Sequence, residues 1–205
     1  MGHVLAVALP ALLLDQLVKI YVKLTFTLGE RMVWLPGVFD IQFIENEGMA
    51  FGWVLPGIWG KLLLTGFRVG AVALLWVYVR KLIAQGATRR VVVSLALVLA
   101  GAAGNIIDSL FYGKIFTVST FGTPASRVFS GDGGTGYAAW FQGNVVDMFH
   151  IAVRFPEWFP VSSWVGREVF PPIFNVADMA ITFGVVGVIL AQWAVQPNRR
   201  AGESA

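Results

Sequence analysis

Four long apolar stretches constrain this chain more than any other feature of its sequence. They cover residues 4–26, 61–82, 91–112 and 173–195, and each approaches the roughly 20 residues that an α-helix needs to cross a bilayer. Charged residues make up only 13% of the 205 residues, whereas soluble domains carry about a quarter. The first stretch has no basic residues before it and contains Asp15 and Lys19, so we interpret it as a retained helix rather than a cleaved leader.

Basic residues predict how these four helices are oriented in the membrane. They lie in the link between the second and third stretches and after the fourth stretch: Arg80, Lys81, Arg89, Arg90, Arg199 and Arg200. Because Lys and Arg concentrate in cytoplasmic loops, both termini are expected to be cytoplasmic, with external segments at about 27–60 and 113–172. Of the 12 acidic residues, all but Glu203 lie in the first stretch, in these external segments or at the outer ends of helices. The chemistry is therefore expected on the outer side.

The two external segments differ in pattern. Residues 38–44 alternate apolar and polar side chains, which is typical of a strand. Residues 113–172 are rich in glycine and proline and favour a long loop. The predicted fold is an all-α integral membrane protein, a single domain over 1–205, with four transmembrane helices, a small extracytoplasmic β-element and a long external loop.

Polar side chains inside the apolar stretches are candidates for function, because a charge in a bilayer is costly. Asp15 and Lys19 are four residues apart on one helical face, and we interpret them as a self-neutralising pair. The pattern Asn-x-x-Asp occurs three times, and on a helix its two members share a face. These pairs are Asn105 with Asp108, Asn144 with Asp147, and Asn175 with Asp178.

Asp108 lies near the end of the third apolar stretch and Asp178 near the start of the fourth, and the external segment between them is expected to bring Asp147 to the same membrane depth. Three carboxylates at one depth predict an acid–base site. Like charges a few ångströms apart raise one another's pKa, so one carboxyl group is expected to hold a proton. Aspartic proteases use such a pair to activate water. The residues alone leave Asp108, Asp147 and Asp178 as equal candidates for that pair.

Other chemistries use the same residue types. Asp108, Asp147, His150 and Asp178 could ligate a divalent metal in a membrane hydrolase. Intramembrane acids also serve ion-coupled carriers, although the chain has no inverted repeat that supports this function. A serine with a lysine base is a further route to peptide hydrolysis, but no spacing singles out such a pair. The net charge of +3 and the lack of a long basic run give no reason to expect a nucleic-acid partner.

Five segments in order resemble the lipoprotein signal peptidases, the signal peptidase II family. Together they extend from residue 15 to residue 178, nearly the whole chain, and their combination is specific although each one is short. The segments are Asp15–Lys19, Asn46–Gly52, Gly101–Asp108, Val145–Met148 and Phe174–Asp178.

The resemblance implies an aspartic endopeptidase of the bacterial inner membrane that needs no cofactor and contains no metal. Such an enzyme cuts prolipoproteins before a cysteine that carries diacylglycerol, so its partners are lipidated signal peptides and membrane lipids, and we expect a monomer. The family's catalytic aspartates correspond to Asp147 and Asp178. The remaining matches are implied to support the site or bind substrate: Asp15, Lys19, Asn46, Gly48, Asn105, Asp108 and Asn175.

Two departures from the family pattern bear on the site. Many members have an arginine after the aspartate of the third segment, whereas Ser109 follows Asp108 here. We hypothesise that Arg68, in the middle of the second stretch, supplies the missing positive charge. The spacings between Asp108, Asp147 and Asp178 are longer than usual, which implies extra external structure around 113–140 and 154–171.

Overall fold

The structure is a computed structural model that describes residues 2–47, 57–122, 126–128 and 136–193. The chain divides into two compact units. The helical unit contains residues up to Gln16, Leu63–Ile107 and the chain from Val176, and the sheet unit contains Leu17–Leu62 and Asp108–Asn175.

Four helices are long and apolar enough to cross a membrane, which confirms the four predicted spans. They begin and end within a few residues of the expected bounds, except that the second begins earlier and the fourth begins only at Val176. The helices are α1 (Gly2–Thr25), α2 (Gly57–Ala84), α3 (Arg89–Ile107) and α5 (Val176–Trp193).

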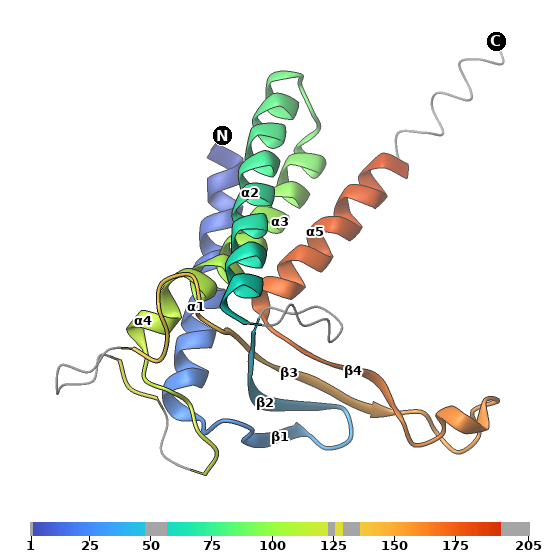
Figure 1. Cartoon of the computed structure of the whole chain (residues 1–205). Helices are drawn as coiled ribbons and strands as arrows, with labels where there is room; N and C mark the ends of the chain where they lie inside the picture. Colours follow the sequence, from blue (N-terminus) through green and yellow to red (C-terminus); the bar gives the residue numbers. More distant parts are fainter. Residues whose placement is uncertain (1, 48–56, 123–125, 129–135, 194–205) are drawn as a thin grey trace. The chain divides into compact units, whose positions relative to one another are not determined.

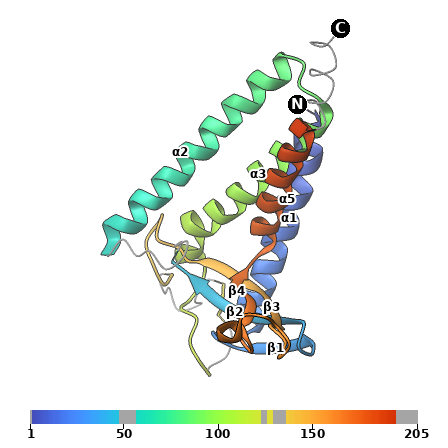
Figure 2. The same ribbon diagram turned by 90° about the vertical axis from the view of Figure 1, so that its right-hand side faces the viewer.

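The helical unit is built around α3, which follows α2 after a short link and packs against α5 (Figure 2). Small residues allow the close approach of α3 and α5. A Cβ atom added to Gly184 would lie 2.5 Å from the Ser94 carbonyl oxygen, and one added to Gly101 would overlap the Ala177 carbonyl. Side chains of α1, α2 and α3 form the core: Val4, Val79, Val92, Leu95, Ala96 and Leu99. Outside this core, α1, α2 and α5 present exposed apolar side chains, among them leucine and phenylalanine, as lipid-facing helices do.

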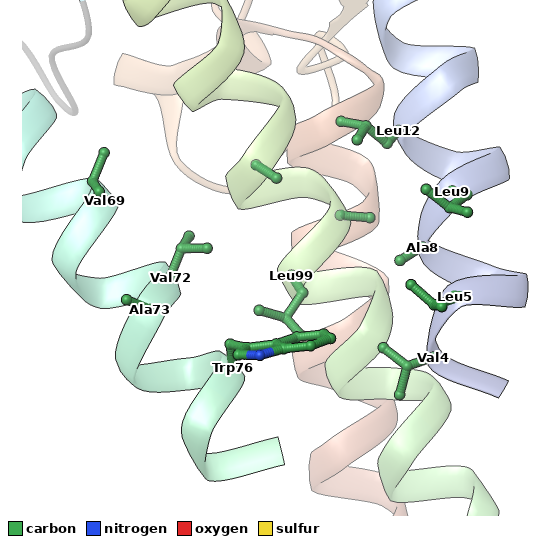
Figure 3. Close-up of a pocket in the computed structure, with 12 residues that line it drawn as sticks. Val4, Leu5, Ala8, Leu9, Leu12, Val69, Val72, Ala73, Trp76 and Leu99 are labelled. Carbon is green, nitrogen blue, oxygen red and sulfur yellow. The ribbon is translucent and has the colours of Figure 1, made fainter. Parts of the chain in front are cut away.

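An apolar groove of about 410 Å³ runs between α1, α2 and α3 (Figure 3). Trp76 of α2 extends toward Leu99 of α3, and Leu5, Leu9 and Leu12 of α1 form the opposite wall. The groove has no charged side chain, so it is a surface for hydrocarbon.

The sheet unit contains a four-stranded antiparallel sheet in the order β1-β2-β3-β4 (Figure 1). Its strands are β1 (Arg31–Leu35), β2 (Phe39–Asn46), β3 (Val145–Arg154) and β4 (Glu168–Phe174). The predicted strand at 38–44 is confirmed as β2. The prediction of a long loop over 113–172 was wrong where β3 and β4 lie, because β3 has buried or half-buried side chains on both faces and its sequence does not alternate apolar and polar residues. This segment also contains the π-helical turn η1 (Asp108–Tyr112), the short helix α4 (Gly113–Ile115) and a 3₁₀ turn at Ser162–Trp164.

One face of the sheet carries a ladder of charged side chains. Asp40 of β2 is paired with Arg31 of β1, and its Oδ2 lies 3.5 Å from His150 Nδ1 on β3. The other ring nitrogen of His150 lies 3.3 Å from Glu168 Oε2 on β4. The ladder therefore connects all four strands through side-chain contacts.

Candidate active site

In the sheet unit, Asp147 is held by two side-chain amides. Asp147 lies on β3 and is only 2% exposed. Asn175 Nδ2 donates to its Oδ1 at 2.6 Å, and Asn46 Nδ2 at the end of β2 donates to its Oδ2 at 3.3 Å. Each carboxylate oxygen thus accepts a hydrogen bond from a side-chain amide, and these two bonds orient the group.

Asp108 has a different environment. Its Oδ2 lies 2.8 Å from Lys19 Nζ of α1, and both side chains are fully buried. The amide of Val146 also donates to this oxygen, at 3.3 Å. A buried carboxylate bound to a buried ammonium is held in its charged form. Asp108 therefore ties α1 to the first residues of β3, directly before Asp147.

In the helical unit, Asp178 lies in the first turn of α5 and is half-buried. Asn105 Nδ2 of α3 donates to its Oδ1 at 3.0 Å. Both residues line a groove of about 390 Å³ between α2, α3 and α5, and Arg68 lines the same groove. The other lining side chains are mostly apolar, so the groove joins one acid and one base to a hydrocarbon surface.

Asp15 stabilises the start of α5. Its Oδ1 accepts a hydrogen bond from the Ala177 amide at 2.8 Å, which satisfies one of the N–H groups that a helix start leaves without a partner. A Cβ atom added to Gly104 of α3 would lie 2.5 Å from Asp15 Oδ2, so only glycine leaves room for this carboxylate. Asp15 is thus an architectural residue that holds the helix carrying Asp178.

Comparisons with known proteins show the family of this chain. The family model for signal peptidase (SPase) II matches residues 7–194. The chain belongs to the signal peptidase II family. The lipoprotein signal peptidase of Porphyromonas gingivalis is 41% identical over 192 residues, which cover 90% of this chain and 80% of that protein. The lipoprotein signal peptidase of Amoebophilus asiaticus is 34% identical, with 90% of this chain and 75% of that protein covered.

A solved structure supports the fold. A bacterial membrane enzyme determined in meso at 2.3 Å resolution matches with a TM-score of 0.64 at 21% identity, over 97% of this chain and 92% of that one. As a member of the signal peptidase II family, the chain is an aspartic-type membrane peptidase. Its four candidate spans and its bacterial relatives make it a protein of the bacterial inner membrane.

The three Asn-x-x-Asp pairs of this signal peptidase II chain lie in different local structures. Asp108 begins the turn η1, Asp147 lies on a strand, and Asn175 precedes α5. Two asparagines instead donate to the aspartate of another pair, Asn105 to Asp178 and Asn175 to Asp147. The Asn-x-x-Asp motifs name these polar residues, but their hydrogen-bonded pairs come from the tertiary fold.

Two other predictions concern single residues. Gly48, implied to be a substrate-cleft residue of the signal peptidase II family, lies outside the described residues. His150, considered as a metal ligand, lies between Asp40 and Glu168 in the sheet. Within the described ranges, no group of three or more His, Cys, Asp or Glu side chains is arranged to hold a metal ion.

The sequence reasoning missed a polar cluster in the sheet unit. Lys23 of α1 is fully buried and ion-paired with Glu45 of β2, and Lys61 of α2 donates to Asn144 Oδ1 at 2.6 Å. A signal for Lys23 was present, because it lies four residues after Lys19 on one face of an apolar helix. No spacing in the sequence links it to Glu45 or Asn144.

Proposed function

We propose that this chain cleaves the signal peptide from diacylglyceryl-modified prolipoproteins at the outer face of the inner membrane, with Asp147 and Asp178 as its catalytic pair. The observation that carries the proposal is that each of these aspartates accepts a hydrogen bond from an asparagine of another Asn-x-x-Asp pair. Membership of the signal peptidase II family supports the aspartic mechanism.

The environment of Asp108 supports the choice among the three carboxylates. Asp108 is neutralised by Lys19 at 2.8 Å, and a carboxylate in such an ion pair is a poor proton acceptor because the ammonium favours its charged form. Asp147 and Asp178 each accept a hydrogen bond from a side-chain amide, which orients the carboxyl group. Asp108 and Lys19 are therefore assigned to support of the site, together with Asp15.

In the mechanism that follows, one carboxylate removes a proton from water while the other donates a proton to the carbonyl oxygen of the scissile peptide. The water attacks the carbonyl carbon, and the C–N bond breaks as the leaving nitrogen takes a proton from the pair. Asn175 and Asn105 orient the two carboxylates, and the family resemblance assigns Asn46 and Gly48 to the substrate cleft. No cofactor takes part in these steps.

Arg68 is assigned to charge balance near Asp178. Arg68 lines the groove that also contains Asp178, and Ser109 is a buried neutral residue where many members have an arginine. Arg68→Leu is expected to lower the cleavage rate while the protein still folds. Unchanged folding and cleavage in this variant would show that Arg68 has no such role.

The proposal includes the placement of the chain in the membrane. Both termini face the cytoplasm, and the sheet and the segments around it form the extracytoplasmic part of a single membrane domain. The basic residues of the α2–α3 link, Arg80, Lys81, Arg89 and Arg90, support this orientation. The partners are lipidated prolipoproteins and membrane lipids, and the enzyme acts as a monomer.

The decisive test is cleavage of a diacylated prolipoprotein peptide by the purified protein in detergent. Asp147→Asn and Asp178→Asn are each expected to abolish cleavage without unfolding the protein, and Glu157→Gln, at an exposed carboxylate, serves as the control. Activity retained in either aspartate variant would refute that assignment. Loss of activity with a chelator would favour a metal-dependent hydrolase. Ion-dependent flux without any cleavage would favour a carrier.

A further inference from the structure

The polar cluster around Glu45 occupies the interior of the sheet unit. Glu45 Oε1 accepts hydrogen bonds from Lys23 and from Ser119 Oγ, the latter at 2.6 Å. Glu45 Oε2 accepts a hydrogen bond from Asn144 Nδ2 at 3.0 Å. Lys23 is fully buried and also donates to Ser119 Oγ at 3.0 Å. A cation and an anion that are both out of water must be held in place by such contacts, because each alone would be costly to bury.

The segment after η1 supplies much of this cluster. Ser119 also contacts Ser126, with 2.7 Å between their hydroxyl oxygens. The rings of Phe116 and Tyr137 lie 5.4 and 5.0 Å from Lys23 Nζ, within the range of cation–π attraction. The Tyr137 hydroxyl accepts a hydrogen bond from the Asn144 amide at 2.6 Å. The described part of the extra structure expected around 113–140 therefore contacts β2, through the hydrogen bond from Ser119 to Glu45.

The cluster adjoins the contacts of Asp147. In the pairing of β2 with β3, Glu45 is opposite Val146, and Ile44 is opposite Asp147. Asn46 follows Glu45 in the chain and donates to Asp147. Asn144 directly precedes β3 and lies three residues before Asp147. Fixing Glu45 and Asn144 to each other thus fixes the ends of both strands that hold Asp147.

We propose that Glu45, with Lys23, Ser119 and Asn144, forms a positioning network that holds the Asn46 amide on Asp147 and so sets the reactivity of that carboxylate. The network acts through Asn46 and does not touch substrate. This inference rests on the proposed catalytic role of Asp147. It gives the segment after η1 a function in catalysis.

Glu45→Gln tests the network in the peptide-cleavage assay. Because the variant loses hydrogen bonds that are made to a charged group, kcat is expected to fall about 10-fold or more while KM changes less than about twofold. Glu30→Gln, at an exposed carboxylate of the same unit, is the matched control and should match the wild type. A kcat for Glu45→Gln equal to that of the wild type, per folded molecule, would overturn the proposal.

The pH profile separates positioning from simple loss of folded protein. The charged groups around these strand ends are Lys23 of α1, Lys61 of α2, Glu45 and Glu47, with Asp108 bound to Lys19. Glu45→Gln removes a negative charge beside the strand ends that hold Asp147, and the loss of a nearby like charge favours the carboxylate form of that acid. The acidic limb of kcat/KM is expected to move down by about half a pH unit. An unmoved limb would contradict the proposal, since a reduced folded fraction alone shifts no limb.

The double variant Lys23→Met with Glu45→Gln covers the case in which Glu45→Gln fails to fold. Removing both charges eliminates the unpaired buried ammonium, so thermal stability should recover while kcat stays reduced. Recovery of both thermal stability and kcat in the double variant would count against a positioning role for the network.

A stability cycle between Glu45→Gln and Asn46→Ala needs no activity and should show coupling, whereas additive effects would overturn the network. If the wild type itself cleaves nothing, the proposed function fails, and this cycle still decides the network.

Discussion

At the scale of single residues, Asn175 has no exposed surface and directs its side-chain amide at β3. Its Nδ2 donates to Asp147 Oδ1 at 2.6 Å and to the Val146 carbonyl at 3.3 Å. Leucine has a similar size but cannot donate. Asn175→Leu should therefore lower kcat by about 10- to 100-fold, the effect of losing a hydrogen bond to a charged group, with little change in KM.

Steady-state kinetics on a lipidated peptide would check this prediction. Gln85→Leu, at an exposed position in the link between α2 and α3, controls for an amide lost elsewhere and should leave kcat unchanged. A kcat within twofold of the wild type in Asn175→Leu would show that this amide does not orient Asp147.

The buried hydroxyl group of Tyr137 predicts how the stability of the folded protein depends on pH. Burial raises the pKa of its hydroxyl group well above the usual value, while the Asn144 hydrogen bond opposes this in part. The folded state therefore keeps a proton that the unfolded state loses above about pH 10. The Tyr137 contribution to stability is thus intact below that pH and is lost as the pH rises beyond it. Melting curves in detergent should show a steeper alkaline loss of stability in the wild type than in Tyr137→Phe. Parallel curves would contradict this.

At the scale of elements, the α3–α5 contact depends on glycine. A Cβ atom at Gly184 would lie 2.5 Å from the Ser94 carbonyl and 2.6 Å from Val98 Cγ2, so the helices would have to move apart. Gly184→Ala should lower stability by about 1–3 kcal/mol, as overpacking does. Gly70→Ala is the matched control, because nothing lies within 4 Å of its added Cβ. Thermal unfolding of both variants would check this, and equal melting temperatures would contradict it.

The elements differ in how well the sequence predicts them, for physical reasons. The four spans are long apolar runs, which are the strongest signal that a sequence carries. β2 alternates and was found, whereas β3 (VVDMFHIAVR) is buried on both faces and resembles any apolar run. β4 contains Pro171 and Pro172, which argue against a strand unless it lies at a sheet edge, as β4 does.

At the candidate site, too, the sequence indicates some features and not others. The aspartates and asparagines follow from motifs, because the family resemblance depends on residue types in order. Their partners do not, because a hydrogen bond such as Asn175 to Asp147 joins residues 28 positions apart. Glu45 and Lys23 belong to no motif, and only the pairing of β2 with β3 shows that they adjoin Asp147.

At the scale of the whole molecule, the absence of cysteine allows a direct test of orientation. Ser163→Cys places a thiol at an exposed position between β3 and β4, and Gln85→Cys places one at an exposed position in the α2–α3 link. If the basic link is cytoplasmic, a membrane-impermeant maleimide should label Ser163→Cys in spheroplasts and label Gln85→Cys only after permeabilisation. The wild type, which has no thiol, gives the background. The reverse labelling pattern would place the sheet in the cytoplasm, where a protease acting on exported prolipoproteins would not meet its substrate.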